Sequence, residues 1–426
     1  MTRRLIPLAL TSVLLIAAPL AMGTPAMGTP AAPTDATAVP RSPTGQALRL
    51  ERVVMLVRHG VRAPLDTEAA PGLAQGDWPA WPVVPSHLTL HGAAAATLMG
   101  AYQRQWLAAN GLLPSTGCPA DGRVAIWTNS AERTIRTGEA MAQGLAPNCS
   151  LAVGHKPPGT LDPLFDPFEA GAATVDAAAA VAAMEPEMSD VRNAPTALAP
   201  AIALTARGLG CDRTAPACDL AHLPTTITPS ADNRGVDLRG PVAQTAGAAQ
   251  IFILQYLEGM PVEQVAWGRL GTGPDLRDAL ARISRLHGLQ FDVFARNAYM
   301  APRKAVALAP RLADALTRAD QPPVTLLVGH DDNIAAITGL LGVHFQARGY
   351  GVDDPPVGGG LRLEVWRDAG GQSLVRVAYV AQTPDQVRTL APLSLETPPW
   401  SAVLPLPGCA ELCPLKTLTD KLVVTR

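Results

Sequence analysis

Three apolar segments that each end in a polar cluster constrain the fold of this chain more than any other feature of its sequence. The segments are Val53–Val57, Val124–Trp127 and Val324–Val328, and their composition is typical of strands buried on both faces of a sheet. The polar residues that follow them read Arg58-His59-Gly60-Val61-Arg62-Ala63-Pro64, Thr128-Asn129-Ser130 and Gly329-His330-Asp331-Asp332-Asn333. We therefore expect three strands that carry polar side chains at their carboxyl ends.

Helix signals follow each predicted strand. Suitable N-caps are Thr89, Ser130 and either Asp331 or Asp332, and the helices should end near residues 109, 144 and 340. This alternation predicts an α/β fold with a mainly parallel central sheet flanked by helices. Because ligands of such sheets bind beyond the carboxyl ends of the strands, the three polar clusters should meet in one site.

The arginines of these clusters suit a phosphate group. Arg58 and Arg62 lie on either side of a glycine, and Arg133 follows the second strand. Each guanidinium offers a fixed fork of N–H donors that matches phosphate oxygens. Each arginine alone would also fit a salt-bridged turn or a solvated helix face. Their joint placement at strand ends is what favours a site for a phosphate ester.

The histidines and the aspartate supply the chemistry. His59 lies between two arginines, which disfavour a metal ion but suit a neutral imidazole that attacks a phosphoryl group. His330 can donate to a phosphate oxygen, and Asp331 can protonate the departing alkoxide, which otherwise leaves poorly. No cysteine or histidine spacing indicates a metal site, so the sequence predicts a reaction without a metal or other cofactor.

The segment Arg58–Pro64, together with the distant pair His330-Asp331, resembles the histidine acid phosphatases, and within them the bacterial periplasmic phytases and glucose-1-phosphatases. The resemblance runs from about residue 50 to the C-terminus. Shorter matches occur at Trp78–Pro82, Tyr102–Gln105, Glu132–Thr134, Thr137–Glu139, Ala266–Gly268, Gly329–Asp331 and Pro392–Leu395.

The resemblance implies a role for each candidate residue. His59 carries a covalent phosphate, Asp331 is the proton donor, and the phosphate is held by Arg58, Arg62, Arg133 and His330. Water then hydrolyses the phosphohistidine, and no cofactor is needed. The resemblance also implies an α/β domain at 48–160 and 309–426 and a second, mostly helical cap domain at 161–308.

The sequence leaves the preferred ester open. Asp66 makes the segment after the heptapeptide acidic, unlike that of phytases, whereas Arg269 follows a Trp-Gly pair as in phytases. Both are candidate specificity residues. A phytase or broad acid phosphatase is the first expectation, and a glucose-1-phosphatase-like sugar phosphatase is the alternative. A non-catalytic phosphate-ester binding protein would not need Asp331, and a phosphomutase, which also uses a phosphohistidine, is usually cytosolic.

The N-terminus predicts export to the periplasm or beyond. Arg3 and Arg4 precede an apolar run to about residue 20 and then small residues, the pattern of a signal peptide at 1–23. The run is short for a membrane-spanning helix, so no membrane attachment is expected after cleavage. A Pro/Thr/Ala-rich tract at 24–47 should be a disordered leader.

The cysteines and the charge fit an exported protein with a small substrate. An even number of cysteines, 6, indicates disulfides, and sequence proximity favours Cys118–Cys149, Cys211–Cys218 and Cys409–Cys413. Charged residues make up 16% of the chain and the formal net charge is -2, so nothing favours nucleic acid or a membrane surface. The expected partner is a small-molecule phosphate monoester.

Overall fold

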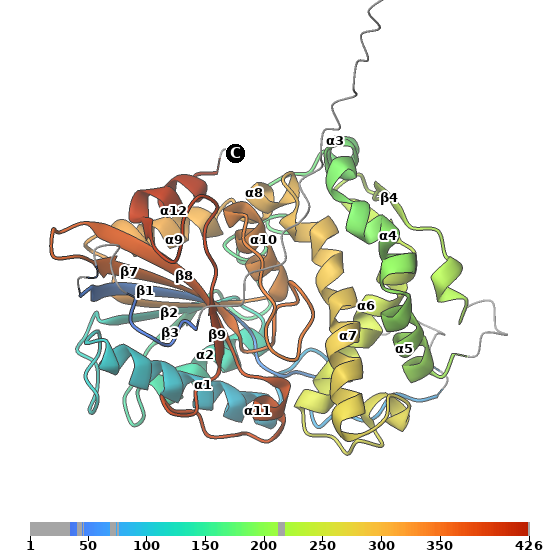
Figure 1. Ribbon diagram of the computed structural model, residues 1–426, viewed down its shortest axis with the longest axis horizontal. Helices are drawn as coiled ribbons and strands as arrows, with labels where there is room; N and C mark the ends of the chain where they lie inside the picture. Colours follow the sequence, from blue (N-terminus) through green and yellow to red (C-terminus); the bar gives the residue numbers. More distant parts are fainter. Residues whose placement is uncertain are drawn as a thin grey trace, which may run out of the picture. The chain divides into compact units, whose positions relative to one another are not determined.

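An eight-stranded sheet contains the three predicted strands (Figure 1). This computed structural model describes residues 35–40, 45, 47–68, 74, 76–211 and 218–424. The strands of the sheet are β1 Arg49–Arg58, β2 Val124–Thr128, β3 Val153–His155, β6 Val324–Gly329, β7 Gly360–Arg367, β8 Ser373–Ala381, β9 Trp400–Val403 and β10 Cys413–Pro414. Their order is β10-β8-β7-β1-β6-β2-β3, and β9 also pairs with β8.

The sheet is parallel on the side of β1 that carries the predicted site. There β1 pairs with β6, β6 with β2, and β2 with β3, all in parallel. On the other side β7 is antiparallel to β1 and β8, and β8 is antiparallel to β9 and β10. The connection from Arg367 to Ser373 is too short for a parallel crossover, which needs about a dozen residues. The α/β class is confirmed, with a sheet that is mixed overall.

Helices follow the strands where the sequence predicts them. After the first predicted strand, Thr89 caps α1, and its hydroxyl accepts from the Gly92 N–H. The helices are α1 Leu90–Ala109, α2 Glu132–Leu145, α3 Ala177–Met184, α4 Ser189–Ala197, α5 Ala199–Leu209, α6 Pro241–Leu257, α7 Gly273–Phe291, α8 Met300–Lys304, α9 Leu308–Thr317, α10 Asp331–Leu341, α11 Pro384–Arg388 and α12 Leu415–Lys421.

Two predicted caps are replaced by neighbouring residues. The N-cap of α2 is Ala131 rather than Ser130, whose hydroxyl donates to a backbone carbonyl instead. The N-cap of α10 is His330 rather than an aspartate, because the Asp331 carboxylate pairs with Arg58. Both differences draw polar side chains toward the end of the sheet.

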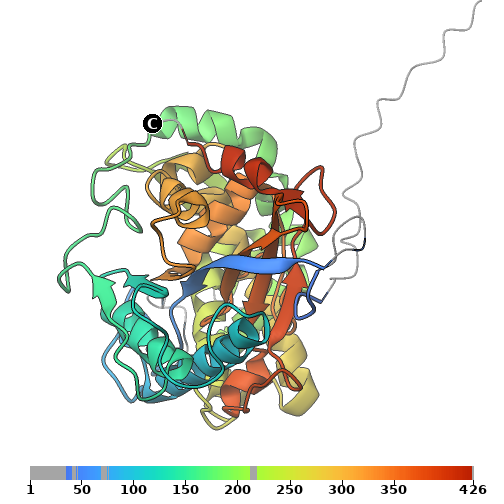
Figure 2. The ribbon, with the colours of Figure 1, turned by 90° about the vertical axis from the view of Figure 1, so that its left-hand side faces the viewer.

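The sheet has an apolar core on each face. Along β1, Val54 and Leu56 belong to one cluster and Val53, Met55 and Val57 to the other, because successive side chains of a strand point to opposite faces. The first cluster includes α9, α10 and α12, and the second includes α1 and α2 (Figures 1 and 2). The buried strands match the apolar runs of the sequence.

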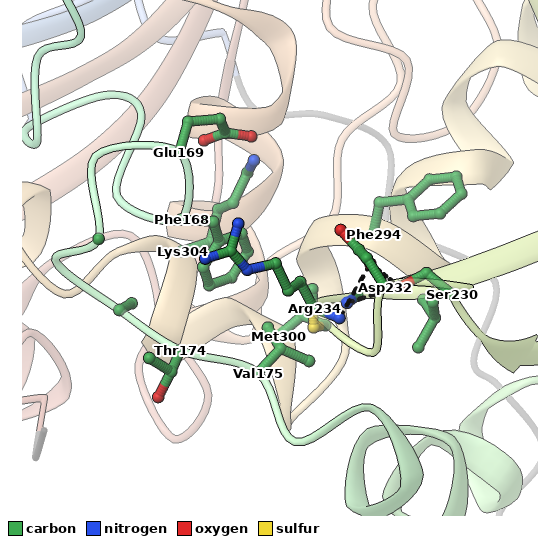
Figure 3. A pocket seen from close by; sticks show the side chains of 14 residues that line it. Phe168, Glu169, Thr174, Val175, Ser230, Asp232, Arg234, Phe294, Met300 and Lys304 are labelled. Atoms are coloured by element: carbon green, nitrogen blue, oxygen red, sulfur yellow. Dashed lines mark hydrogen bonds between the residues drawn. The ribbon is translucent and has the colours of Figure 1, made fainter.

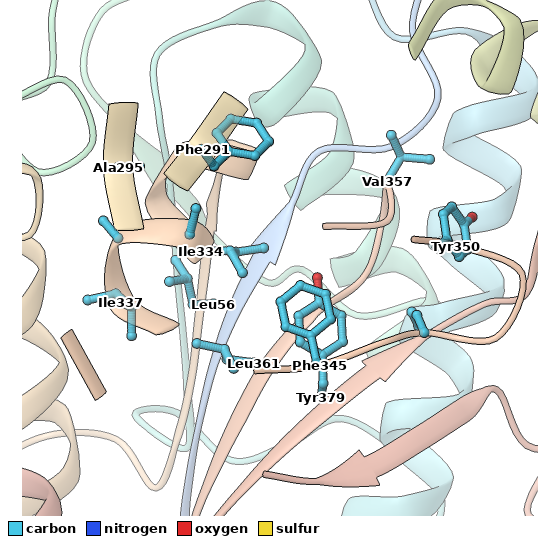
Figure 4. Close-up of a cluster of buried hydrophobic side chains, with 14 of the residues drawn as sticks. Leu56, Phe291, Ala295, Ile334, Ile337, Phe345, Tyr350, Val357, Leu361 and Tyr379 are labelled. Atoms are coloured by element: carbon cyan, nitrogen blue, oxygen red, sulfur yellow. The ribbon is translucent and has the colours of Figure 1, made fainter. Parts of the chain in front are cut away.

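The first cluster holds α10 against the sheet (Figure 4). Ile334 and Ile337 of α10 are fully buried in it, and the Phe345 ring stacks on Tyr379 with centroids 4.1 Å apart. This packing holds the helix that begins where β6 ends.

The chain between β3 and β6 is mostly helical. It contains α3 to α9 and a small sheet of β4 Thr226–Pro229 and β5 Val236–Arg239. Side chains of α5, α6 and α7 share the first apolar cluster with β1. Among the described residues, no helix is long and apolar enough to cross a membrane.

Three disulfides join the cysteine pairs that sequence proximity favours. They are Cys118–Cys149, Cys211–Cys218 and Cys409–Cys413. Disulfides persist in oxidising compartments, so they fit an exported protein. The predicted signal peptide at 1–23 lies outside the described residues, as does most of the predicted leader.

Part of the predicted disordered leader is folded, which corrects that expectation. Residues 35–40 lie against the antiparallel half of the sheet, where Ala36 is fully buried. Arg376 donates to the carbonyls of Ala36 at 3.2 Å and Ala38 at 2.8 Å, and Arg362 donates to Ala36 at 2.9 Å. The segment is ordered because buried guanidinium groups on the sheet require these backbone acceptors.

Removing residues up to 40 should therefore destabilise the folded chain. The deletion leaves buried donors of Arg362 and Arg376 without acceptors, at about 1–3 kcal/mol for each unsatisfied group. The midpoint of thermal unfolding (Tm) should be lower than that of a chain that begins at residue 34. Equal Tm values for the two chains would show that the segment contributes no stability.

Candidate active site

The parallel register of β1, β6 and β2 brings the three polar clusters together, as the sequence predicts. The His59 N–H donates to the Gly329 carbonyl at 3.0 Å, and the Asn129 N–H donates to the Val328 carbonyl at 2.9 Å. His330 follows directly after β6, and its ring centroid lies 5.6 Å from that of His59. The residues that leave the three strands are therefore neighbours at one edge of the sheet.

His59 is buried, neutral and held in one orientation. Its Nδ1 lies 2.8 Å from the Gly60 carbonyl, which can only accept, so Nδ1 carries the proton and Nε2 keeps its lone pair. Burial, then Arg133 and the other nearby cations, hold the pKa of His59 well below its ordinary value. The side chain is 2% exposed. A neutral imidazole with a free Nε2 is suited to nucleophilic attack.

Glu68 holds the end of the Arg62 guanidinium. Glu68 Oε2 accepts from Arg62 Nη1 at 2.8 Å, and Oε1 accepts from Nη2 at 2.5 Å. Burial alone would raise the pKa of the Glu68 carboxyl, but its pair with Arg62 lowers it. The sequence shows Glu68 in an acidic stretch without indicating this partner, because the pairing depends on how the loop after the heptapeptide folds back.

Arg58 and Arg133 are held by other parts of the fold. Arg58 Nη1 donates to the Pro355 carbonyl at 2.5 Å, and Nη2 lies 2.7 Å from Asp331 Oδ2. Arg133 Nη2 lies 3.5 Å from His330 Nδ1. All three predicted phosphate-binding arginines therefore reach the same site from different elements.

The Nε donors of these three arginines share one property. In Arg58, Arg62 and Arg133, the Nε atom is buried and has no hydrogen-bond partner among the described residues. Buried donors without partners are rare in folded proteins. A tetrahedral oxyanion has enough acceptors for all of them, and guanidinium–phosphate bonds are among the strong ones.

Asp331 begins α10 and is ionised in this state of the site. Burial alone would raise its pKa, but Arg58, followed by His287 and the other nearby cations, holds the pKa of Asp331 well below its usual range. A phosphate dianion bound beside it would offset these cations and favour the protonated form. Asp331 can then serve as an acid only when the anion is present.

His330 is neutral at ordinary pH and contacts Asn129. Its Nε2 lies 3.2 Å from Asn129 Oδ1, which also accepts from the Ala131 N–H at 2.9 Å. The amide oxygen therefore fixes the proton of His330 on Nε2. Burial, then Arg133, lower the pKa of His330 to about 4. Asn129 stands in the second predicted cluster, but its sequence context does not reveal that it orients His330.

His287 and Asp354 also lie at the site, although nothing in the sequence marks them. His287 Nε2 is 3.7 Å from Asp331 Oδ2, and His287 Nδ1 is 2.6 Å from Asp354 Oδ1. In the sequence His287 stands between Leu286 and Gly288, with no polar motif around it. Only the folded chain brings it to the catalytic edge.

A cavity of about 750 Å³ lies beside this edge (Figure 3). Lys304 lines it and pairs with Asp332, the residue after Asp331, at 2.7 Å. None of the residues that line it belongs to the phosphate-binding set. The charged side chains on its walls are of both signs, namely Glu169, Asp232, Arg234 and Lys304.

The two candidate specificity residues lie outside the phosphate-binding set. Asp66 is exposed and lines a second cavity of about 320 Å³ with Trp78 and Trp81. Arg269 lies over the Trp267 ring, 5.2 Å from its centroid. Within the part of the chain that the structure describes, no group of three or more His, Cys, Asp or Glu side chains is placed to hold a metal ion.

The fold and the candidate site are those of an α/β protein that gathers three arginines, two histidines and an aspartate at the carboxyl edge of a parallel sheet. A family model described as "Histidine phosphatase superfamily (branch 2)" matches residues 49–194. Phytase AppA of Escherichia coli (strain K12) is 36% identical over 399 residues, covering 85% of this chain and 88% of that protein. A glucose-1-phosphatase of Salmonella typhimurium is 32% identical over 401 residues, covering 89% and 93%.

Solved structures agree with these relatives. Hafnia alvei phytase in complex with myo-inositol hexakis sulphate superposes with a TM-score of 0.80 and 33% identity, covering 89% of this chain and 97% of that one. Klebsiella sp. ASR1 phytase has a TM-score of 0.80 and 28% identity, covering 88% and 95%. The chain belongs to branch 2 of the histidine phosphatase superfamily.

The lowered pKa of His330 should make the folded chain less stable in acid. An unfolded histidine takes up a proton near pH 6.5 and the folded one only near pH 4, so the unfolded state binds more protons between these values. The contribution of neutral His330 to the free energy of unfolding is therefore fully present above pH 6.5. It is lost as the pH falls toward 4, by up to about 3 kcal/mol.

We expect the Tm of the unliganded protein to fall less steeply between pH 7 and pH 4.5 in His330→Gln than in the wild type. His222→Gln, which changes an exposed histidine paired with Asp219, is the control and should keep the wild-type slope. A His330→Gln variant with the wild-type slope would contradict the assignment.

Proposed function

We propose that this protein hydrolyses phosphate monoesters by way of a covalent phosphate on His59. The observation that carries the proposal is the placement of a neutral His59, with Nε2 free, among three arginines whose buried Nε donors have no partner among the described residues. Preorganised donors of this kind stabilise the charge that develops on a transferring phosphoryl group. The relatives that match the chain are phytases and glucose-1-phosphatases, which supports the same conclusion.

The proposed reaction has two steps. His59 Nε2 attacks phosphorus, the bond to the ester oxygen breaks, and Asp331 gives its proton to the leaving alkoxide. Water then attacks the phosphohistidine and gives a proton to Asp331, and inorganic phosphate leaves. Arg58, Arg62, Arg133 and His330 hold the phosphate oxygens in both steps.

The favoured substrate is that of a phytase or broad acid phosphatase. In the cavity beside Asp332, Lys304 and Arg234 can contact a further anionic group of the substrate, and Glu169 and Asp232 of the same cavity can accept from its hydroxyls. A sugar phosphatase is the second candidate, because Asp66 shares its cavity with two tryptophan rings, which suits a neutral polyol better than a polyanion. Measuring kcat/KM on phytate, glucose 1-phosphate and an aryl phosphate separates the two.

We further propose a periplasmic or secreted location and a helical cap over the site. The three disulfides and the predicted signal peptide support export. The helices between β3 and β6 contribute Lys304 and His287 to the surroundings of Asp331 and Asp332, which supports a cap at 161–308. A non-catalytic binding protein is the opposing hypothesis, and any turnover excludes it.

His59→Ala should abolish turnover, because it removes the imidazole whose Nε2 attacks phosphorus in the proposed mechanism. Wild-type protein quenched during turnover should carry phosphate that is stable to base, labile to acid and located on His59 by peptide mapping. Arg136→Ala, which breaks only an exposed pair with Glu139, is the matched control and should retain activity. Full activity of His59→Ala would refute the mechanism.

Asp331→Asn should impair alkyl esters far more than p-nitrophenyl phosphate. An alkoxide needs a proton to leave, whereas nitrophenolate leaves unaided, so the loss of kcat on the alkyl ester should be about 10²–10⁴-fold. With Asp331 required in its protonated form, wild-type activity should be highest in acid, at about pH 4–5.5. An equal loss on both esters would mean that Asp331 orients the substrate or acts only in the second step.

A further inference from the structure

A buried histidine–carboxylate pair lies behind Asp331. His287 stands near the end of α7, and its side chain is 4% exposed, while that of Asp354 is 2% exposed. Nδ1 of His287 donates to Asp354 Oδ1 at 2.6 Å, which turns Nε2 toward Asp331 Oδ2 at 3.7 Å. The imidazole therefore lies between two carboxylates, one of which begins α10.

The fold is built to hold this pair closely. A Cβ atom added to Gly288 would lie 2.8 Å from the Val352 carbonyl oxygen and 3.0 Å from the Asp354 nitrogen. Only a residue without a side chain allows the loop that carries Asp354 to approach α7 so closely. The Phe291 ring packs edge-on against His287 with centroids 5.1 Å apart, which limits rotation of the imidazole.

The role proposed for Asp331 requires a source for its proton. The Arg58 guanidinium, 2.7 Å away, favours the carboxylate form, whereas an acid catalyst must hold a proton when the ester bond breaks. The His287 imidazole lies between two carboxylates, and with Nδ1 on Asp354 its Nε2 faces Asp331, so a proton on Nε2 lies next to the carboxylate that needs it. The structure therefore joins a carboxylate that lacks a proton to a neighbour that can supply one.

We propose that His287, held by Asp354, supplies the proton that Asp331 delivers to the leaving group. The inference rests on the proposed function and extends it to two residues outside the phosphate site. His287 is a positioning residue that acts through Asp331 and does not touch the ester. The contact of 3.7 Å shortens to a hydrogen bond in the substrate complex, as catalytic hydrogen bonds often do.

The proton balance is closed within one turnover. As the P–O bond of the ester breaks, His287 Nε2–H gives its proton to the Asp331 carboxylate and Asp331 delivers that one proton to the alkoxide, which leaves Asp331 ionised and His287 neutral. In the second step, water that attacks the phosphohistidine passes one proton to Asp331. Asp331 passes this proton to His287, which restores the Nε2–H of the imidazole for the next ester.

The groups that face the pair come from several elements. Those acting on Asp331 are Arg58, Arg62 and His330, with Arg133 and Tyr379 also coupled to it. Those acting on His287 are Asp331, Asp354 and Glu68. Every one of them except His287 and Asp354 remains unchanged in the experiment below.

The direction of a pH shift in His287→Asn tests the proposal. If His287 stores the proton, the His287→Asn variant leaves Asp331 to hold that proton alone beside Arg58. The alkaline limb of the pH profile of kcat on an alkyl phosphate then moves to lower pH. If His287 acted only as a nearby cation, its loss would make Asp331 easier to protonate, and the same limb would move to higher pH. We expect the first result, with kcat on the alkyl ester at pH 6 lower by about tenfold or more and KM little changed.

The same variant should hydrolyse p-nitrophenyl phosphate at nearly the wild-type rate, since that leaving group needs no proton. Asp354→Asn should shift the alkyl-ester limb in the same direction and serves as the second variant if His287→Asn does not fold. The control is His344→Asn. It removes the neighbouring pair of His344 with Asp353, also 2.6 Å long, in which the histidine side chain is 71% exposed.

The outcomes separate this inference from the proposed function. A wild-type enzyme that forms acid-labile phosphate on His59 supports the function whatever His287 does. An alkaline limb that stays in place or moves to higher pH in folded His287→Asn, or an equal loss on alkyl and aryl esters, overturns the proton-supplying role. A shift in His344→Asn as large as that in His287→Asn would also overturn it.

Discussion

Parallel pairing of β1 with β6 is the contact on which the site depends. The ladder runs from Val53 opposite Val324 to Arg58 opposite Gly329. Because parallel strands end at the same edge, this register places His59 beside His330. A shift by one residue would exchange the side chains of β1 between its two cores and move His59 out of line with His330, so the packing of the sheet also fixes the positions of the residues at its end.

The balance of charge at this edge of the sheet explains which contacts the arginines and carboxylates of the site make with one another. The buried guanidinium groups of Arg58 and Arg62 and the half-buried one of Arg133 repel one another, and burial together with Arg62 lowers the pKa of Arg133 to about 10. Glu68 and Asp331 offset part of this charge by pairing with Arg62 and Arg58. In the part of the chain that the structure describes, the Nε donors of these arginines have no partners, so a bound dianion would complete the site electrostatically and through hydrogen bonds.

In the proposed mechanism, the helical part of the chain contacts the acid, and the sheet supplies the nucleophile. His59 leaves β1 directly, whereas Asp331 is contacted by His287 from α7 and lies next to Asp332, which pairs with Lys304 from α8. Attack and proton donation can therefore be altered separately. Changes in α7 or in the loop at Asp354 can alter the pH dependence without disturbing the residues that bind phosphate.

The sequence alone determined the features that depend on residues close together along the chain. Apolar runs predicted the three strands, Thr89 predicted the start of α1, and the polar residues that end each strand predicted the site at the carboxyl edge. These predictions hold because a buried strand and the residues that follow it can be recognised from short-range patterns in the sequence. The cysteine pairs also follow from proximity along the chain.

Tertiary structure alone decided the contacts between distant residues. His287 meets Asp354 across 67 positions of the sequence, and no periodicity or motif links the two. The same holds for the order of residues 35–40, whose composition predicts disorder but whose carbonyls satisfy the buried Arg362 and Arg376. Buried charges and donors take their partners from wherever the fold brings an acceptor, and that choice depends on packing that a linear sequence does not display.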